Sequence, residues 1–163
     1  MCNSRDFLLL AYKYCHMEYA QIRVPAFNIA GIAIRTTNAN GQAMKDIGEL
    51  WQRFMQQQVL QSIPGRVSDD IVCMYTDYES NFNAPYTTII GCKVTGGHIL
   101  PDGLVFKEIP AALYRLYKPV GQLPESIVQT WMNIWQSEIP RAYAADFDVY
   151  KQDGSAETYL SVL

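Results

Sequence analysis

Apolar and polar residues recur with two different periods along the chain, and the same order of periods occurs twice. Residues 21–38 read as an extended strand containing Pro25 and Gly31, which predicts an edge strand with a bend or a bulge. Residues 43–63 carry apolar side chains three and four positions apart, which predicts an amphipathic helix. The stripe of this helix consists of Met44, Ile47, Leu50, Trp51, Phe54, Met55 and Val59.

Strands and a second helix continue the pattern. Residues 70–78 and 86–94 predict two strands joined by a polar turn. The expected elements of the second half are a strand region over 104–120, a helix over 124–139, a strand over 143–150 and a last strand over 157–163. The second helix has Pro124 in its first turn, and its apolar stripe consists of Ile127, Trp131, Ile134 and Trp135. The chain therefore reads as strand, helix, strand, strand, and then as the same order again.

Local similarity supports an internal repeat, which tells more about architecture than any single motif. The stretch MYTDYES aligns with DFDVYKQ, which sets Tyr75 against Phe147 and Tyr78 against Tyr150. Each half has only about 70 residues, too few to bury both a sheet and a helix well. We therefore expect the two halves to pack against each other.

One domain with an N-terminal extension follows from this repeat. The extension covers residues 1–19 and the domain covers 20–163, with repeat halves over 20–97 and 98–163. The expected fold class is α+β, with two β-α-β-β modules related by a pseudo-twofold axis. Their antiparallel sheets would form a central ligand groove, because ligands prefer such interfaces.

Aromatic side chains are abundant, at 12% of the chain with eleven tyrosines. Their apolar rings and polar tips suit a half-buried cleft or an interface. They either pack in the core and across strands, or line a binding site. The aromatic candidates for ligand contact are Trp51, Tyr75, Tyr78, Tyr86, Tyr114, Tyr117, Trp131, Trp135 and Tyr150.

Two carboxylates accompany these rings on the strand over 143–150. Because strand side chains alternate, Asp146, Asp148 and Tyr150 share one face, opposite Phe147. That face is either solvated or turned into the groove. In a groove, a partly buried carboxylate beside aromatic rings would recognise an organic cation.

The repeat alignment ranks the acids of the first half. If Tyr75 points toward the helix, as its aligned partner does, then Tyr78 and not Asp77 shares the face of Asp148. Glu79 lies beyond the end of that strand. The candidate acids for ligand contact are Asp146, Asp148 and Glu79.

Charge and motifs exclude several classes of function. The net charge is -3 and the thirteen basic residues are scattered, which argues against direct nucleic-acid binding. The sequence has only two histidines and lacks zinc-site spacing, nucleophile motifs and phosphate-binding glycine loops. We expect no catalytic residue, no metal and no cofactor.

Cysteine usage and hydropathy indicate a cytoplasmic protein. Cys73 and Cys92 could face each other in a hairpin, but two buried thiols are favoured over a disulfide in a reducing compartment. The apolar stretch FLLLAY is too short to span a bilayer and lacks a signal-peptide pattern. We expect no membrane partner.

Several segments together resemble the GyrI-like effector-binding superfamily, the ligand domain of multidrug-sensing transcription activators. They are AGIAIRTTN, LWQRF, YTDYES with YTTIIGCKV, GLVFKEIPAALYRLY, WMNIWQSEIPRAYAADFDVY and ETYLSV, in the expected order over about residues 21–163. Within the superfamily, the integron-associated effector-binding proteins are the most similar. The resemblance implies a central pocket for small, often cationic and lipophilic compounds, without metal or cofactor.

The resemblance also raises the question of DNA binding. The full-length activators carry a helix-turn-helix part before this domain, whereas about twenty residues precede it here, too few for such a module. We therefore expect a stand-alone binding domain in transcription regulation or drug sensing, or a partner of a separate DNA-binding protein.

Three positions depart from the family pattern. Many relatives have a pocket glutamate where Ala144 follows Tyr143 in this chain. The family motif DFEVY is DFDVY here, with the shorter acid Asp148, and Ala112 replaces a usual glycine. A cation preference would then depend on Asp146, Asp148 or Glu79.

Binding of an aromatic or cationic organic ligand is the leading interpretation, and the chain is not expected to be an enzyme. Some superfamily members hydrolyse small molecules with a pocket carboxylate, and Glu79 or Asp148 would be the base in that alternative. A protein-interaction or inhibitor module, as for relatives that inhibit gyrase, is the other alternative.

Overall fold

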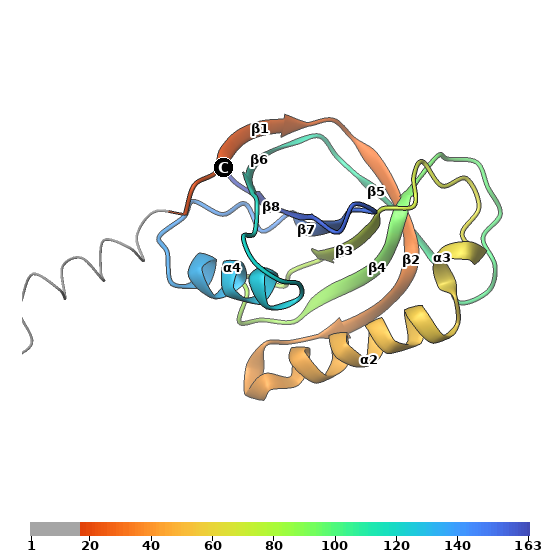
Figure 1. The fold of residues 1–163 in the computed structure, drawn as a ribbon, viewed down its shortest axis with the longest axis horizontal. Helices are drawn as coiled ribbons and strands as arrows, with labels where there is room; N and C mark the ends of the chain where they lie inside the picture. Colours follow the sequence, from red (N-terminus) through yellow and green to blue (C-terminus); the bar gives the residue numbers. More distant parts are fainter. Residues whose placement is uncertain (1–16) are drawn as a thin grey trace, which may run out of the picture.

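The structure, a computed structural model, describes residues 17–163. One antiparallel sheet of eight strands forms its framework, with helices against the outer side of the sheet (Figure 1). The strands are β1 (Ala20–Val24), β2 (Phe27–Thr36), β3 (Ile71–Thr76), β4 (Tyr86–Val94), β5 (Val105–Ile109), β6 (Ala112–Tyr117), β7 (Ala145–Tyr150) and β8 (Ala156–Ser161). The helices are α2 (Gln42–Gln56), α3 (Val59–Ser62) and α4 (Glu125–Trp135), with a 3-10 turn at Ala39–Gly41. The predicted α+β class is confirmed.

The sheet closes on itself, because the bent strand formed by β1 and β2 pairs along its length with the bent strand formed by β5 and β6. Its order is β1-β6-β8-β7-β3-β4-β2-β5. One continuous register runs through both bends, with Ala20 opposite Leu116 and Gly31 opposite Val105. Since the chain passes directly from β1 into β2 and from β5 into β6, the two ends of the sheet are joined. Figure 1 shows the two bent strands arching around β3, β7 and β8.

A proline lies at each bend. Pro25 separates β1 from β2, and Pro110 separates β5 from β6. Proline has no N–H to donate, so it interrupts the ladder where the strands turn. The bend predicted for residues 21–38 is confirmed, and the strand region over 104–120 bends at the matching place.

Apolar side chains fill the space that the closed sheet encloses. They are Val24, Ile29, Val72, Met74, Ile89, Ile109, Tyr114, Ala145, Phe147 and Val149. On the wall of this enclosure, Gly31 of β2 lies opposite Gly91 of β4. A Cβ added to Gly91 would collide with the backbone carbonyl of Ala30, so this strand pair requires glycine.

The first helix packs on β2 and β4 through Leu50 and Phe54, which are buried. Met44 and Met55 of its predicted stripe are instead exposed. The predicted helix over 43–63 breaks at Gln58, whose backbone is left-handed with φ of 49°. The break begins the short helix α3 and keeps its first residue, Val59, in the core.

The second helix, α4, lies beside β8. Ile127, Trp131 and Ile134 are buried in the cluster beneath it, together with Leu160 of β8. Trp135, the last residue of the predicted stripe, is 42% exposed. The apolar periodicity therefore predicted the buried face of α4 except at its end.

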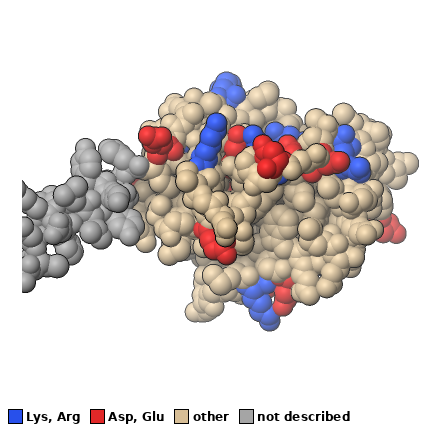
Figure 2. All heavy atoms as spheres, viewed as in Figure 1, with Lys and Arg blue, Asp and Glu red and all other residues tan. Residues whose placement is uncertain are grey.

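Surface charges of both signs are interspersed on the face shown in Figure 2. None of the helices within residues 17–163 is long and apolar enough to cross a membrane. Cys73 and Cys92 are buried free thiols, as predicted. Cys2, Cys15 and most of the predicted extension over 1–19 lie outside the described residues.

Candidate functional site

Aromatic rings gather on the outer face of β3 and β7, between α2 and α4. Tyr75 of β3 and Tyr150 of β7 each pack against the apolar clusters beneath both helices. The ring centroid of Trp131 from α4 lies 5.3 Å from that of Tyr75, and the centroid of Trp51 from α2 lies 5.0 Å from that of Tyr150. Both pairs are edge to face, the arrangement that ring quadrupoles favour. These four residues form what we call the aromatic site.

The carboxylate of Asp148 is completely buried against the aromatic site. Its Oδ2 accepts hydrogen bonds from the Tyr75 hydroxyl and from Nε1 of Trp131, both at 3.0 Å. Its Oδ1 accepts a bond of 2.6 Å from the Thr158 hydroxyl. Every one of these donors is neutral, and no Lys, Arg or His within residues 17–163 forms an ion pair with Asp148.

Burial raises the pKa of Asp148 to about 6, because the desolvation of the carboxylate outweighs its hydrogen bonds. Burial also raises the pKa of the Tyr75 and Tyr150 hydroxyls, and the charge of Asp148 raises both pKa values further. Asp148, which lies beside the aromatic site, therefore titrates near neutrality and has no countercharge among the described residues. Such an acid can hold a cation or accept a proton.

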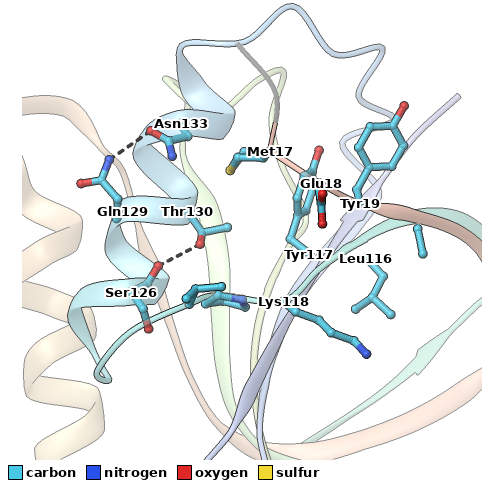
Figure 3. Close-up of a pocket in the computed structure, with 13 residues that line it drawn as sticks. Met17, Glu18, Tyr19, Leu116, Tyr117, Lys118, Ser126, Gln129, Thr130 and Asn133 are labelled. Atoms are coloured by element: carbon cyan, nitrogen blue, oxygen red, sulfur yellow. Dashed lines mark hydrogen bonds between the residues drawn. The ribbon is translucent and has the colours of Figure 1, made fainter. Parts of the chain in front are cut away.

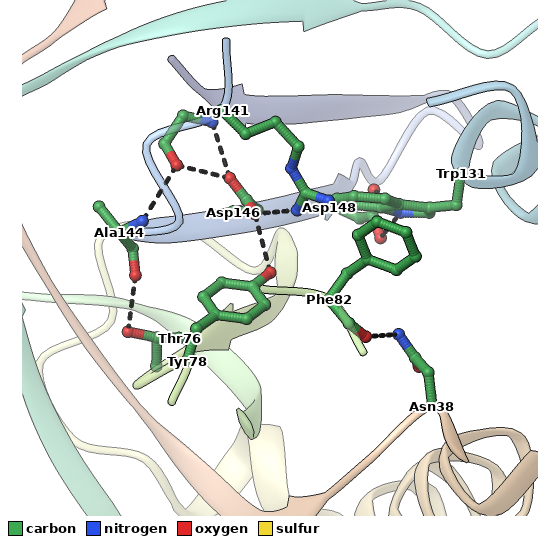
Figure 4. Close-up of polar contacts among 10 residues, drawn as sticks. Asn38, Thr76, Tyr78, Phe82, Trp131, Arg141, Ala144, Asp146 and Asp148 are labelled. Atoms are coloured by element: carbon green, nitrogen blue, oxygen red, sulfur yellow. Dashed lines mark hydrogen bonds and ion pairs between the residues drawn. The ribbon is translucent and has the colours of Figure 1, made fainter. Parts of the chain in front are cut away.

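A second buried carboxylate, Asp146, does have a positive partner. Its Oδ2 accepts hydrogen bonds from Nη2 of Arg141 and from the Tyr78 hydroxyl, both at 2.8 Å (Figure 4). Its Oδ1 accepts bonds of 2.7 Å from the backbone N–H and the hydroxyl of Ser161. Only 5% of the Arg141 side chain is exposed. Asp146 is thus neutralised within the chain, whereas Asp148 is not.

Four aromatic rings surround the guanidinium of Arg141. The central guanidinium carbon lies 4.3 Å from the ring centroid of Tyr143, and 5.8, 5.9 and 6.0 Å from those of Phe82, Trp131 and Tyr78. We call these four residues the arginine cage. Because Trp131 belongs to both groups, the cage and the aromatic site are contiguous.

Most of the predicted ligand contacts lie in or beside these two groups. They are Trp51, Tyr75, Tyr78, Tyr86, Trp131, Trp135, Asp146, Asp148 and Tyr150. Tyr86 connects the groups, since its ring lies 6.2 Å from Tyr75 and 5.5 Å from Tyr78. Trp135 packs beside Trp131 and stacks on Phe82 at the exposed end. Residues from both predicted halves therefore lie together here.

Three predicted residues lie elsewhere. Tyr114 is inside the closed sheet, where its ring packs on Phe147. Tyr117 is buried on the side of α4 that faces β6. Glu79 is exposed in the turn between β3 and β4 and makes no side-chain hydrogen bond or ion pair with the described residues. Among the candidate acids, only Asp146 and Asp148 are buried beside the rings.

The residues that sequence reasoning missed are mostly in irregular segments. Arg141 and Tyr143 lie between α4 and β7, and Phe82 lies in the turn between β3 and β4. Thr158 was missed because it looks like an ordinary strand residue, yet it bonds Asp148 from the neighbouring strand β8. The available signal was position alone, since Arg141 and Tyr143 directly precede the acidic strand.

The structure excludes one of the two alternatives for a strand face and corrects one alignment. The face with Asp146 and Asp148 is not solvated, because both side chains are fully buried. The alignment of Tyr75 with Phe147 is wrong: Tyr75 lies opposite Asp146, on the carboxylate face, while Phe147 points into the enclosed core. The alignment was one residue out of register, and such a slip exchanges the two faces.

Tyr78 nevertheless reaches the carboxylates, as expected, for a different reason. Asp77 has φ of 51°, a left-handed conformation that interrupts the alternation after β3. The chain turns there, and the Tyr78 hydroxyl points to Asp146. Asp77 itself faces outward, where its carboxylate pairs with Lys107 at 2.7 Å.

A separate cavity of about 770 Å³ opens beside α4 (Figure 3). Its lining comes from the start of β1, the end of β6 and the side of α4 that carries Ser126 and Thr130, and it includes Tyr117 and Lys118. Neither buried carboxylate lines it. Within residues 17–163, no cluster of His, Cys, Asp and Glu side chains is suited to a metal ion.

Comparison with known proteins gives a match over nearly the whole domain. A family model described as an integron-associated effector binding protein matches residues 22–162. The protein YobU of Bacillus subtilis (strain 168), whose name proposes a role as a transcriptional regulator, is 28% identical over 147 residues, covering 87% of this chain and 89% of YobU. The transcriptional regulator BrlR of Pseudomonas aeruginosa is 25% identical over 151 residues. That match covers 88% of this chain but only 52% of BrlR.

Solved structures share the fold. An integron cassette protein from the mobile metagenome of Vibrio cholerae superposes with a TM-score of 0.71 at 25% identity, covering 89% of this chain and 95% of that one. The structure of SAV2435 bound to tetraphenylphosphonium superposes with a TM-score of 0.73 at 18% identity, covering 90% and 94%. This chain therefore shares its overall fold with both proteins.

Proposed function

The chain belongs to the family of integron-associated effector binding proteins, and on that premise we propose that it binds lipophilic organic cations between α2 and α4. The positive centre of the ligand lies beside Asp148, and its apolar substituents pack among the rings of the aromatic site. The proposed ligand contacts are the predicted residues that the structure gathers there, with Asp148 in place of the pocket glutamate that many relatives carry.

The observation that carries this proposal is the uncompensated carboxylate of Asp148. A charge buried without a partner is costly, and here the cost appears as a pKa of about 6 instead of roughly 3.9 for an exposed aspartate. That difference corresponds to about 3 kcal/mol at neutral pH. A ligand cation would supply the missing countercharge and recover part of this free energy on binding.

The rings favour the same class of ligand. Aromatic faces attract cations most strongly where water is excluded, and they also bury apolar substituents. Among proteins with this fold, SAV2435 has a structure bound to tetraphenylphosphonium, a cation of this kind. We infer that the edge-to-face contacts of Trp51 with Tyr150 and of Trp131 with Tyr75 open when such a ligand enters.

The names of the relatives support a regulatory role. YobU and BrlR carry names of transcriptional regulators, and the match to BrlR covers about half of that protein. We propose that the ligand shifts this domain between two arrangements of α2 and α4 on the sheet, which a separate DNA-binding protein reads. The basic residues are scattered along the sequence, which argues against direct contact with nucleic acid.

Titration with two ions of the same shape and opposite charge tests the proposal. Tetraphenylphosphonium should quench the tryptophan fluorescence of the protein, because Trp131 and Trp51 line the aromatic site, and tetraphenylborate should not. Asp148→Asn removes the charge at nearly constant volume and should weaken binding by at least about tenfold. Glu79→Gln, at an exposed unpaired acid, is the matched control and should bind like the wild type.

Equal binding of both ions would show that the site selects for shape and hydrophobicity alone. Unchanged affinity in a folded Asp148→Asn variant would remove Asp148 from the site. Absence of binding across a wider panel of lipophilic cations, with the protein folded, would overturn the proposal itself.

Hydrolysis is a second candidate, and the raised pKa of Asp148 is the observation in its favour. A carboxylate with a pKa of about 6 could act as a general base near neutral pH. Three donors already form hydrogen bonds with its oxygens, so the base would need the ligand to displace one of them. Turnover of an activated ester that persists in Asp148→Asn would exclude this mechanism.

A further inference from the structure

The guanidinium of Arg141 is bound in the way that an organic cation is bound by a receptor. It lies among the four rings of the arginine cage, beside the buried carboxylate of Asp146. An aromatic cage with an acid at one side is the usual recognition geometry for a cationic group. Here that cationic group comes from the chain itself. Figure 4 shows it between Asp146 and the ring of Trp131.

The guanidinium is incompletely satisfied in this place. Nη2 donates to Asp146, but Nε and Nη1 are buried without any acceptor among the described residues. Buried donors of an arginine are normally all paired, because each unpaired donor loses its hydrogen bonds to water without replacement. An arginine whose role was only to anchor Asp146 would be expected to use more of its five donors. The arrangement is that of an occupant which can be displaced.

The local chain allows such displacement. Arg141 lies in the irregular segment between α4 and β7, outside the named strands. Its backbone is held by an isolated bridge to Val162, while its side chain alone reaches the cage. Withdrawal of the side chain would therefore break the ion pair and the ring contacts but no hydrogen bond of the closed sheet.

The cage is also next to the place where the ligand is proposed to bind. Trp131 contacts the guanidinium with its ring and donates its Nε1 hydrogen to Asp148. A ligand with bulky substituents around its positive centre, placed beside Asp148, would need the volume on the Trp131 side. That volume includes the space of the Arg141 guanidinium.

We propose that Arg141 is a tethered occupant of the ligand site, which an effector must displace; this inference rests on the proposed function. In the ligand-free chain, Arg141 holds the rings together and fills the site with a positive group of its own. Its displacement sets the threshold concentration of the effector, and the departing side chain marks the difference between the free and bound states.

Charge-balanced variants separate occupancy from simple neutralisation of Asp146. Arg141→Ala with Asp146→Asn removes one positive and one negative charge, so the site keeps its net charge while losing the occupant. Arg141→Met with Asp146→Asn has the same charge balance but keeps most of the side-chain volume. We expect the alanine double variant to bind tetraphenylphosphonium about tenfold more tightly than the wild type, and the methionine one to fall between them.

The kinetics of binding give a second measurement. In stopped-flow fluorescence, a displacement step should make the observed rate of the wild type level off with rising tetraphenylphosphonium concentration. The alanine double variant should show a linear dependence. Thermal unfolding establishes that each variant is folded before it is titrated.

Equal affinities and equal rate profiles in the wild type and the alanine double variant would overturn the occupant role and leave the proposed function intact. Failure of wild type and variants alike to bind the cation would instead overturn the proposed function. If the alanine variant does not fold, the methionine variant decides: its affinity should still exceed that of the wild type, and equality would refute the proposal.

Discussion

Replacement of Asp148 by asparagine should change how the stability of the protein depends on pH. The folded state raises the pKa of this carboxyl to about 6, whereas an unfolded chain leaves it at roughly 3.9. Between these values the folded state holds the proton more tightly than the unfolded state. The free energy of unfolding therefore falls as pH rises through this window, by about 3 kcal/mol in total for this group.

Asp148→Asn lacks this titration. Its amide nitrogen cannot accept the hydrogen bonds that one carboxylate oxygen accepts, which gives a cost that is nearly constant with pH. The difference in unfolding free energy between variant and wild type should thus shift in favour of the variant by about 2 kcal/mol from pH 4 to pH 7.5. This change with pH, rather than the absolute difference, reports the buried charge.

Urea unfolding followed by circular dichroism at several pH values measures the effect. Glu79→Gln is the control, because this acid is exposed and its profile should run parallel to that of the wild type. Parallel profiles for Asp148→Asn and the wild type would refute the reasoning, since they would mean that Asp148 keeps an ordinary pKa in the folded state.

Three further predictions concern the ligand and the framework. Tetraphenylphosphonium should bind about tenfold more weakly at pH 5 than at pH 7.5, because only about a tenth of Asp148 is ionised at pH 5, and isothermal titration of Asp148→Asn should show no such dependence. Trp131→Phe removes the Nε1 donor to Asp148 and should lower the free energy of unfolding by about 1–3 kcal/mol; a melting temperature equal to that of the wild type would contradict the proposed hydrogen bond. Gly91→Ala should destabilise by about 3 kcal/mol or prevent folding, since its Cβ meets the Ala30 carbonyl, whereas Gly48→Ala on the exposed side of α2 should stabilise by about 1 kcal/mol. Similar melting temperatures for these two glycine variants would show that β2 and β4 can move apart.

Local patterns predicted the elements well, because apolar positions recur with one period in helices and with another in strands. The stripe with Leu50 and Phe54 and the stripe with Ile127 and Trp131 identified the helices and their buried faces. Alternation also placed Asp146 and Asp148 together on one face of β7. These features depend on neighbours within a few positions, which the sequence displays directly.

Long-range geometry was not visible in the same way. The sheet closes through the pairing of β1 with β6 and of β2 with β5, which lie far apart in the sequence. The local pattern of each strand does not indicate which strand it pairs with. The left-handed backbone at Asp77 interrupts the alternation after β3, so that Tyr78 reaches the carboxylate face although Tyr75 also lies on it. Arg141 was missed because it lies in an irregular segment, where no period predicts a direction for its side chain.

The pairing of β1 and β2 with β6 and β5 also affects how the chain folds during its synthesis. β1 and the outer edge of β2 find their partners only in β6 and β5, which extend to Tyr117, so more than two thirds of the chain must leave the ribosome before this ladder can form. Until then, one edge of β2 offers unpaired N–H and C=O groups to any other extended chain. The pairing that abolishes this edge in the mature fold is therefore unavailable until β5 and β6 have been made. Aggregation in cells should respond to the rate of translation between β4 and β6.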